Sequence, residues 1–176
     1  SIRSTPGIPA NPLTSADFLK DIPAQQVSRW LRDQKVFDNS INVENRIFNG
    51  FQIELGDSYF VKVDTLRSYN LAVFSLGDSV VQTDLKSGLN MISTPIGISY
   101  TSHSLIGDIN TASEVVRWQP TKQAYDSAFD IGQGVVIGKN FVIESGKGYF
   151  LRVSGDFIWS IDGDGSTGPT QVATRR

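Results

Sequence analysis

The chain has 176 residues, a net charge near −2 and 39% hydrophobic residues, a balance that predicts a folded globular body. Its basic residues are scattered, which gives no support to nucleic-acid binding, and it has no run of about eighteen apolar residues for insertion into a membrane. Cysteine is absent, which excludes disulfides, thiolate metal sites and thiol nucleophiles.

The first half of the chain predicts one short helix, one hairpin and one further strand. The helix covers residues 15–22, with Ser15 as its N-cap. Alternating apolar residues predict a hairpin over residues 51–63 that turns at "GDS", followed by a strand over residues 69–76.

The second half predicts similar elements in the same order, preceded by an additional strand. In chain order these are a strand over 87–95, a helix over 102–109 capped by Ser102, a hairpin over 115–129 with Pro120 at its tip, a hairpin over 141–153 and a strand over 157–161.

The chain contains an internal repeat. Residues 51–63, FQIELGDSYFVKV, and residues 141–153, FVIESGKGYFLRV, are identical at seven of thirteen positions. This order indicates one structural unit of roughly ninety residues that has been duplicated. The other matching segments are 24–38 with 112–126, and 4–22 with 93–109.

The repeat determines the fold that we expect. It is mainly β, with two tandem and structurally similar units that are β-sandwiches or small barrels, each with one short helix. The choice between sandwich and barrel stays open. We expect a first repeat over residues 1–78, a second over residues 79–161, and a linker or C-terminal arm over residues 162–176.

The two repeats differ at their starts. The second begins with the apolar strand at residues 87–95, whereas the segment matching Gly88 to Asn90 would fall before Ser1. We therefore expect the first repeat to lack one strand and to associate, through the exposed sheet edge, with other copies or other surface proteins. The alternative is that the first repeat closes differently or has been trimmed.

Four aromatic residues are candidates for ligand binding: Trp30, Trp118, Tyr125 and Trp159. On one exposed face, their rings would form a stacking platform for the sugar rings of a glycan. The alternative is packing in the core or between the repeats, because large aromatic side chains chiefly bury area. Solvent exposure of the tryptophans distinguishes the two interpretations.

Asp162, Asp164 and Ser166 alternate with glycines in "DGDGS", the spacing of oxygen ligands with which calcium loops begin. The distal glutamate of a complete EF-hand loop is missing. A Ca²⁺ site at these residues and an ordinary linker are both open, and we expect no other cofactor.

The sequence favours a protein that is not an enzyme. Its single histidine, His103, argues against a histidine-based triad or a multi-histidine metal site. Glu54 and Glu144 occupy equivalent positions, which indicates a shared structural role such as pairing with Arg29 and Arg117. An enzyme would more usually concentrate its acids in one cleft.

The second copy reads GLNMISTP at residues 88–95, then a short helix, VVRW at residues 115–118 and SGKGYFL at residues 145–151. This order resembles a repeat of bacterial secreted and cell-surface proteins, whose pattern is approximately "GWNLISLP", a strand with Trp or Tyr, and "PGKGYWV". The resemblance covers the second copy and most of the first. It implies a non-catalytic module of a large extracellular protein, sometimes beside adhesion or carbohydrate-active domains.

We therefore expect an extracellular structural or adhesive module without catalytic activity, a subunit or fragment of a bacterial cell-surface assembly or filament. The alternative is a carbohydrate-binding module of a secreted multidomain protein. Both interpretations place the chain outside the cell or at its surface.

Overall fold

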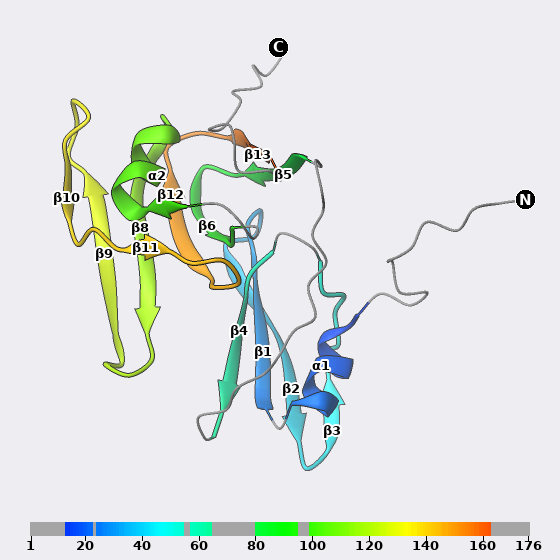
Figure 1. Cartoon of the computed structure of the whole chain (residues 1–176). Coiled ribbons are helices and arrows are strands. Elements are labelled where there is room, and N and C mark those ends of the chain that lie inside the picture. The colour runs from blue at the N-terminus through cyan, green and yellow to red at the C-terminus, as the bar shows by residue number, and fades with distance from the viewer. Residues whose placement is uncertain (1–12, 23, 55–56, 65–79, 95–98, 163–176) are drawn as a thin grey trace, which may run out of the picture. The chain divides into compact units, whose positions relative to one another are not determined.

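The computed structural model forms two compact units, whose helices and strands are labelled in Figure 1. Unit 1 consists of Ser1–Arg29, Phe37–Leu55 and Tyr59–Phe74, and unit 2 consists of Trp30–Val36, Gly56–Ser58 and Ser75–Arg176. The residues that the structure describes are 13–22, 24–54, 57–64, 80–94 and 99–162.

Two short helices, α1 (Ser15–Asp21) and α2 (Ser102–Asp108), form where the sequence predicts them. Each begins with a capping box, in which a threonine hydroxyl accepts a hydrogen bond from the backbone of the third helical residue. The cap residues are Thr14 and Thr101, and each cap satisfies backbone groups that the first helical turn leaves unpaired.

The expected caps, Ser15 and Ser102, are wrong by one residue, because both serines are buried and make other contacts. The Ser15 hydroxyl accepts a hydrogen bond from Phe51 N at 2.9 Å, and the Ser102 hydroxyl accepts one from Phe141 N at 3.1 Å. In return, Ser15 N donates to Phe51 O, and Ser102 N donates to Phe141 O. Each serine therefore ties the start of its helix to a distant extended segment.

Unit 1 contains a four-stranded sheet in the order β3-β2-β1-β4. β1 pairs antiparallel with β4, and β2 pairs antiparallel with β3. Helix α1 contributes Leu19 to a small core with Val27 of β1 and with Phe51. The strands are β1 (Ala24–Leu31), β2 (Val36–Val43), β3 (Arg46–Phe48) and β4 (Tyr59–Val63).

Unit 2 contains a five-stranded sheet in the order β10-β9-β8-β12-β6, and two further strand pairs, β11-β7 and β13-β5. All these pairs are antiparallel. The strands are β5 (Val80–Leu85), β6 (Gly88–Ile92), β7 (Tyr100–Thr101), β8 (Ala112–Gln119), β9 (Ala124–Asp130), β10 (Val136–Gly138), β11 (Val142–Ile143), β12 (Tyr149–Val153) and β13 (Phe157–Asp162).

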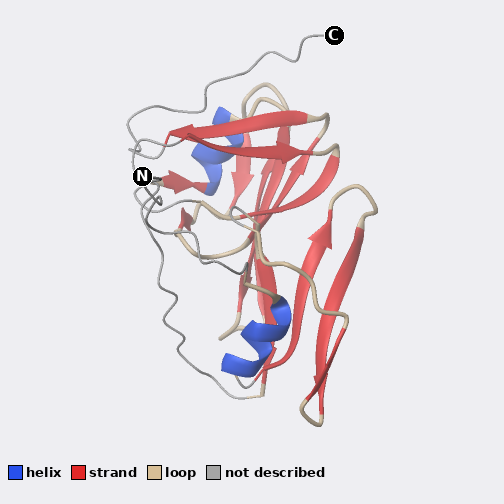
Figure 2. Ribbon diagram, turned by 90° about the vertical axis from the view of Figure 1, so that its right-hand side faces the viewer, coloured by secondary structure: helices blue, strands red, loops and turns tan. Residues whose placement is uncertain are grey.

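The core of unit 2 joins its helix to its sheets. Helix α2 contacts β8 and β9, as Figure 1 shows. Leu105 of α2, Val115 of β8, Leu151 of β12, Ile92 of β6 and Trp159 of β13 are fully buried in one cluster. The expectation of a mainly β fold with short helices is therefore confirmed, as Figure 2 illustrates by secondary structure.

The hairpins predicted over residues 51–63 and 141–153 are wrong. β4 pairs with β1, and β12 pairs with β8 and β6. The segments that precede them pair near the helix starts instead, because Gln52 bridges to Thr14 and β11 pairs with β7. The alternation of apolar and polar residues indicates which face of a strand is buried, but it does not indicate which other strand pairs with it.

The hairpin predicted over residues 115–129 is confirmed. β8 and β9 pair antiparallel on either side of residues 120–123, with Trp118 opposite Tyr125.

The strand predicted over residues 157–161 is present as β13, where Trp159 and Ile161 are buried and Phe157 packs against the same core. It pairs with β5, so the turn at residues 154–156 carries the chain from one sheet to another. The strand predicted over residues 69–76 lies outside the described residues.

Two valines at matching positions of the two units differ in burial. We therefore expect their substitution by alanine to lower the free energy of unfolding by different amounts. Val153 of β12 is 1% exposed, whereas Val63 of β4 is 37% exposed. Val153→Ala should lower the free energy of unfolding of unit 2 by about 2 kcal/mol, because buried apolar groups are lost and a cavity is left. Val63→Ala should cost unit 1 less than about 1 kcal/mol. Urea denaturation measures both, and equal losses would contradict this expectation.

Candidate functional site

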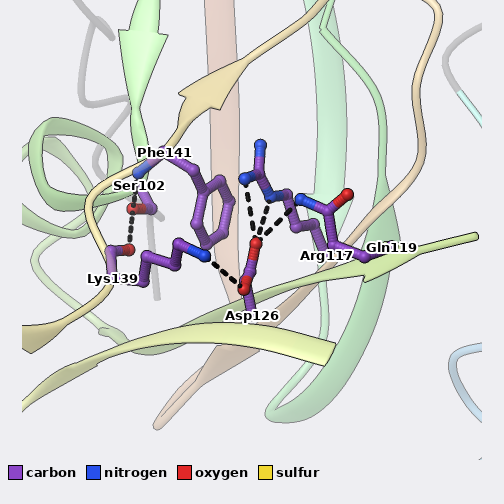
Figure 3. Close-up of polar contacts among 6 residues, drawn as sticks. All are labelled: Ser102, Arg117, Gln119, Asp126, Lys139 and Phe141. Carbon is purple, nitrogen blue, oxygen red and sulfur yellow. Dashed lines mark hydrogen bonds and ion pairs between the residues drawn. The ribbon is translucent and has the colours of Figure 1, made fainter. Parts of the chain in front are cut away.

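A cluster of charged and polar side chains surrounds Asp126 in unit 2 (Figure 3). One carboxylate oxygen accepts hydrogen bonds from Arg117 Nε at 2.9 Å and from Gln119 Nε2 at 2.8 Å. The other oxygen accepts a hydrogen bond from Lys139 Nζ at 3.0 Å. The side chain of Asp126 is only 12% exposed, so these three donors replace most of its water.

The Arg117 guanidinium connects this cluster to aromatic rings. Its central carbon lies 4.5 Å from the centre of the Phe141 ring, a cation–π contact. The Phe141 ring stacks on Tyr149, with ring centres 6.2 Å apart and an interplanar angle of 10°. The Tyr149 hydroxyl accepts a hydrogen bond from Glu144 N at 2.8 Å. The network therefore links β8, β9 and β12 with the segment around β11.

Figure 3 also shows Ser102, which joins helix α2 to the same network. Its hydroxyl donates to Lys139 O at 3.0 Å and accepts from Phe141 N. The Lys139 backbone thus anchors the helix while its side chain pairs with Asp126. These contacts hold the start of helix α2, strand β9 and the segment before β11 together.

Unit 1 contains the corresponding contacts. Arg29 Nε donates to Asp38 Oδ2 at 2.9 Å, and the guanidinium lies 4.4 Å from the centre of the Phe51 ring. Phe51 stacks on Tyr59 with ring centres 6.1 Å apart, and the Tyr59 hydroxyl accepts a hydrogen bond from Glu54 N at 2.8 Å.

The expected pairing of the repeated glutamates with Arg29 and Arg117 is not what the structure shows. The two arginines pair with aspartates on the neighbouring strand, and Glu144 pairs with Lys147 instead. The signal was present in the sequence, because Asp38 and Asp126 are identical between the aligned segments. The backbone amides of the glutamates, not their carboxylates, make the contact that the two units share.

The hydrogen bond from Gln119, followed by the contacts with Lys139 and Arg117, holds the pKa of the Asp126 carboxyl well below its usual range. Asp126 is therefore ionised at neutral pH and cannot supply a proton as a general acid.

Two of the four aromatic candidates form one pair. The Trp118 and Tyr125 rings lie on neighbouring strands, with centres 4.8 Å apart and planes inclined at 58°. Tyr125 is 56% exposed. The pair offers one accessible ring and the side of another, rather than two coplanar rings.

The other two aromatic candidates make internal contacts. The Trp30 indole donates to Leu89 O at 2.7 Å, within unit 2. Trp159 has no exposed surface and packs beside Tyr100, with ring centres 6.3 Å apart. Burial, together with Asp108, raises the pKa of Tyr100 to about 12, so this core tyrosine remains neutral.

The calcium candidates fall at the limit of the described chain. Asp162 is the last residue of β13, and the structure describes only its backbone. Asp164 and Ser166 lie outside the described residues. Within the described ranges, no three His, Cys, Asp or Glu residues come together in an arrangement that could hold a metal ion. The Ca²⁺ site remains a prediction.

A hollow of about 300 Å³ in unit 1 is lined by Leu19, Lys20, Asn42, Asn45 and Ile47. One ammonium and two amides can hold a small polar group there.

The outer side of β4, which we call the open edge, has no described strand beside it. In unit 2, β12 lies between β8 and β6, whereas among the described strands of unit 1 β4 has only β1 beside it. Val61 and Val63 of β4 are each 37% exposed, while their counterparts Leu151 and Val153 of β12 are 0% and 1% exposed. Val61 lies opposite the buried Val27, so an apolar, core-facing side of the strand is left partly in solvent.

Comparisons with protein-family models, curated proteins and solved structures find no match to this chain. No helix within the described part is both long enough and apolar enough to cross a membrane.

Acid should destabilise unit 2 through Asp126. Because its folded-state pKa is lowered, its contribution to stability is complete above the pKa of an unfolded aspartate, about 3.9, and is lost as the pH falls through the folded value. We expect Asp126→Asn to be less stable than wild type at pH 7 and to lose less stability between pH 7 and pH 3. Urea midpoints at the two pH values measure this.

The control for this measurement is Asp33→Asn, which changes the same chemical group at an exposed position. It should reproduce the wild-type loss between pH 7 and pH 3. If Asp126→Asn lost as much stability between pH 7 and pH 3 as wild type, the contacts of the Asp126 carboxylate would not be the source of the acid sensitivity.

Proposed function

We propose that this chain is a non-catalytic structural or adhesive module of an extracellular bacterial surface assembly or filament. The observation that carries the proposal is the open edge, where Val61 and Val63 keep over a third of their surface in solvent. A strand that leaves an apolar side partly in solvent can pack against another chain, because burial of apolar surface and new hydrogen bonds both favour the contact.

The similar strand orders and contacts of the two units support this proposal. The strand order β3-β2-β1-β4 of unit 1 corresponds to β10-β9-β8-β12 of unit 2. Each unit also carries an arginine between an aspartate and a phenylalanine ring, and a tyrosine hydroxyl that accepts from a glutamate amide. Repeated units of this kind are the parts from which extended proteins are built. The resemblance of GLNMISTP and SGKGYFL to repeats of bacterial surface proteins favours the same setting.

The polar groups around Asp126 are used for internal cohesion, which agrees with a role other than catalysis. Asp126 is surrounded by three donors, and Arg117 and Lys139 both point toward it (Figure 3). A site for acid–base chemistry needs a group whose proton is exchanged with a substrate.

The second candidate is a carbohydrate-binding module of a secreted multidomain protein. The exposed Tyr125 ring beside Trp118 favours it, since aromatic rings at a surface stack on sugars. The burial of Trp159 and the 58° inclination of the pair leave a smaller platform than the four aromatic residues would make together.

The mass of the native particle tests the proposal. We expect light scattering of the full chain at increasing concentration to show species larger than one chain, because the open edge favours association. A single-chain mass at every concentration would overturn the self-assembly proposal. Binding of a glycan that is lost in Tyr125→Ala and kept in Tyr59→Phe would then establish the second candidate.

A further inference from the structure

Asn49 is followed by Gly50, the one Asn-Gly pair among the 176 residues. An asparagine reacts with its own backbone when the nitrogen of the next residue attacks the carbon of the side-chain amide. Glycine has no Cβ to hinder that approach. We therefore expect Asn49 to be the most reactive asparagine of the sequence.

The reaction, a deamidation, balances with water alone. A bond forms between Gly50 N and the side-chain carbon of Asn49, the bond from that carbon to Nδ2 breaks, and ammonia leaves with the proton of the Gly50 amide. Water then adds to the cyclic imide. Opening of the ring gives aspartate or, when the other ring bond is cleaved, isoaspartate, in which the main chain runs through the former side chain.

Water has access to both residues, because Asn49 and Gly50 are exposed. They lie between the end of β3 at Phe48 and the core residue Phe51. The φ of Asn49 is 56°, a left-handed conformation that asparagine and aspartate adopt more readily than most other residues with a side chain. An aspartate formed here is therefore compatible with the same backbone conformation.

The nitrogen that leaves is the atom through which Asn49 contacts strand β2. Asn49 Nδ2 donates to Asp38 Oδ1 at 2.6 Å and to Asn39 O at 3.1 Å. Deamidation replaces this donor by a carboxylate oxygen, which accepts hydrogen bonds and donates none. Both contacts are lost, and the new carboxylate repels that of Asp38.

Asp38 connects this change to the core of unit 1. Its side chain is 18% exposed, and its other oxygen accepts a hydrogen bond from Arg29 Nε at 2.9 Å. The Arg29 guanidinium lies 4.4 Å from the centre of the Phe51 ring. A second carboxylate competes with Asp38 for this arginine, and an isoaspartate lengthens the main chain just before Phe51. Both effects should lower the stability of unit 1.

Unit 2 has a cation at the corresponding position. Lys139 stands two residues before the stacked phenylalanine, as Asn49 does in unit 1, and its Nζ donates to Asp126 Oδ1 at 3.0 Å. A lysine has no amide to lose, and the asparagine that follows it, Asn140, precedes a phenylalanine rather than a glycine. We therefore expect the change in unit 1 and not at the matching position of unit 2.

We infer that Asn49 is a site of spontaneous deamidation, and that the carboxylate formed there breaks the contacts with Asp38 and destabilises unit 1. This property is independent of the proposed function. It gives unit 1 a limited lifetime in water, because the ammonia that leaves is not restored.

Mass spectrometry of the full chain tests the site. Samples are incubated at pH 8.5 and at pH 6 and then digested, and each peptide that contains an asparagine is followed over time. The mass increase from asparagine to aspartate should appear at Asn49 before any other asparagine. It should appear faster at pH 8.5, because the attacking nitrogen must lose its proton. An unmodified Asn49 after other asparagines have reacted would overturn the inference.

Gly50→Ala is the matched control for the reaction. A Cβ at Gly50 would lie 3.4 Å from Ala16 Cβ, an ordinary contact, so the fold should be kept. The added methyl group hinders the approach of the backbone nitrogen, and we expect deamidation at Asn49 to slow down.

Urea denaturation tests the consequence. Asn49→Asp imitates the product and should lower the urea midpoint of unit 1 at pH 7, with a smaller difference at pH 3, where the new carboxyl is protonated. Asn49→Lys installs the cation of unit 2 and should keep the wild-type midpoint. Asn45→Asp makes the same chemical change as Asn49→Asp at another exposed residue, with a φ of 66°, and should also keep it.

A wild-type midpoint for Asn49→Asp at pH 7 would show that the product does not destabilise unit 1. If circular dichroism shows that this variant does not fold, wild type and Gly50→Ala are compared after the same incubation at pH 8.5. Equal losses of the urea midpoint in both would overturn the link between deamidation and stability. Light scattering of fresh protein measures self-assembly separately, so failure of this inference leaves the proposed function standing.

Discussion

The Arg117 guanidinium, held between the Asp126 carboxylate and the Phe141 ring, is the contact on which unit 2 depends. A partly buried arginine needs both a counter-ion and a surface that tolerates its flat, weakly hydrated faces. Asp126, on the next strand, provides the counter-ion. The Phe141 ring, in the loop before β11, provides the surface on which the guanidinium lies. The Phe141 backbone N–H also donates a hydrogen bond to the Ser102 hydroxyl, and the Phe141 ring stacks on Tyr149. The Arg117 contact therefore connects a hairpin, a helix start and an aromatic stack. Arg29 fulfils the same role in unit 1.

The same contacts among arginine, aspartate, phenylalanine and tyrosine therefore occur in two sheets whose described strands differ. In unit 2 the strand that carries the stacked tyrosine lies between two neighbours, and in unit 1 its counterpart has one neighbour among the described strands. The stack of Phe51 on Tyr59 is intact even so, with nearly the same geometry as that of Phe141 on Tyr149. The aromatic stack therefore has the same geometry in both units, although the described strands beside it differ.

Local sequence signals predicted part of this structure well. The helices at residues 15–22 and 102–109 and the hairpin at residues 115–129 follow from short-range patterns, because capping and turn residues act within a few positions. The hairpins expected at residues 51–63 and 141–153 failed because the tight "GDS" and "SGKG" stretches resemble hairpin turns, while the partner of each strand lies far away in the sequence. Long-range pairing leaves no local signature. The different exposure of β4 and β12 is not visible in either segment alone, and the burial of Trp159 follows only from tertiary packing.

The difference in described neighbours between β4 and β12 has a consequence for the exchange of amide hydrogens with solvent. In an antiparallel pair, successive residues point their N–H groups alternately toward the neighbour and away from it. In β12 both directions meet a strand, so slow exchange should run through the whole segment. Among the described strands only β1 lies beside β4, so slow exchange is expected first for the β4 amides that are directed at β1. The pattern of deuterium uptake along these five residues therefore reports whether a second strand lies beside β4.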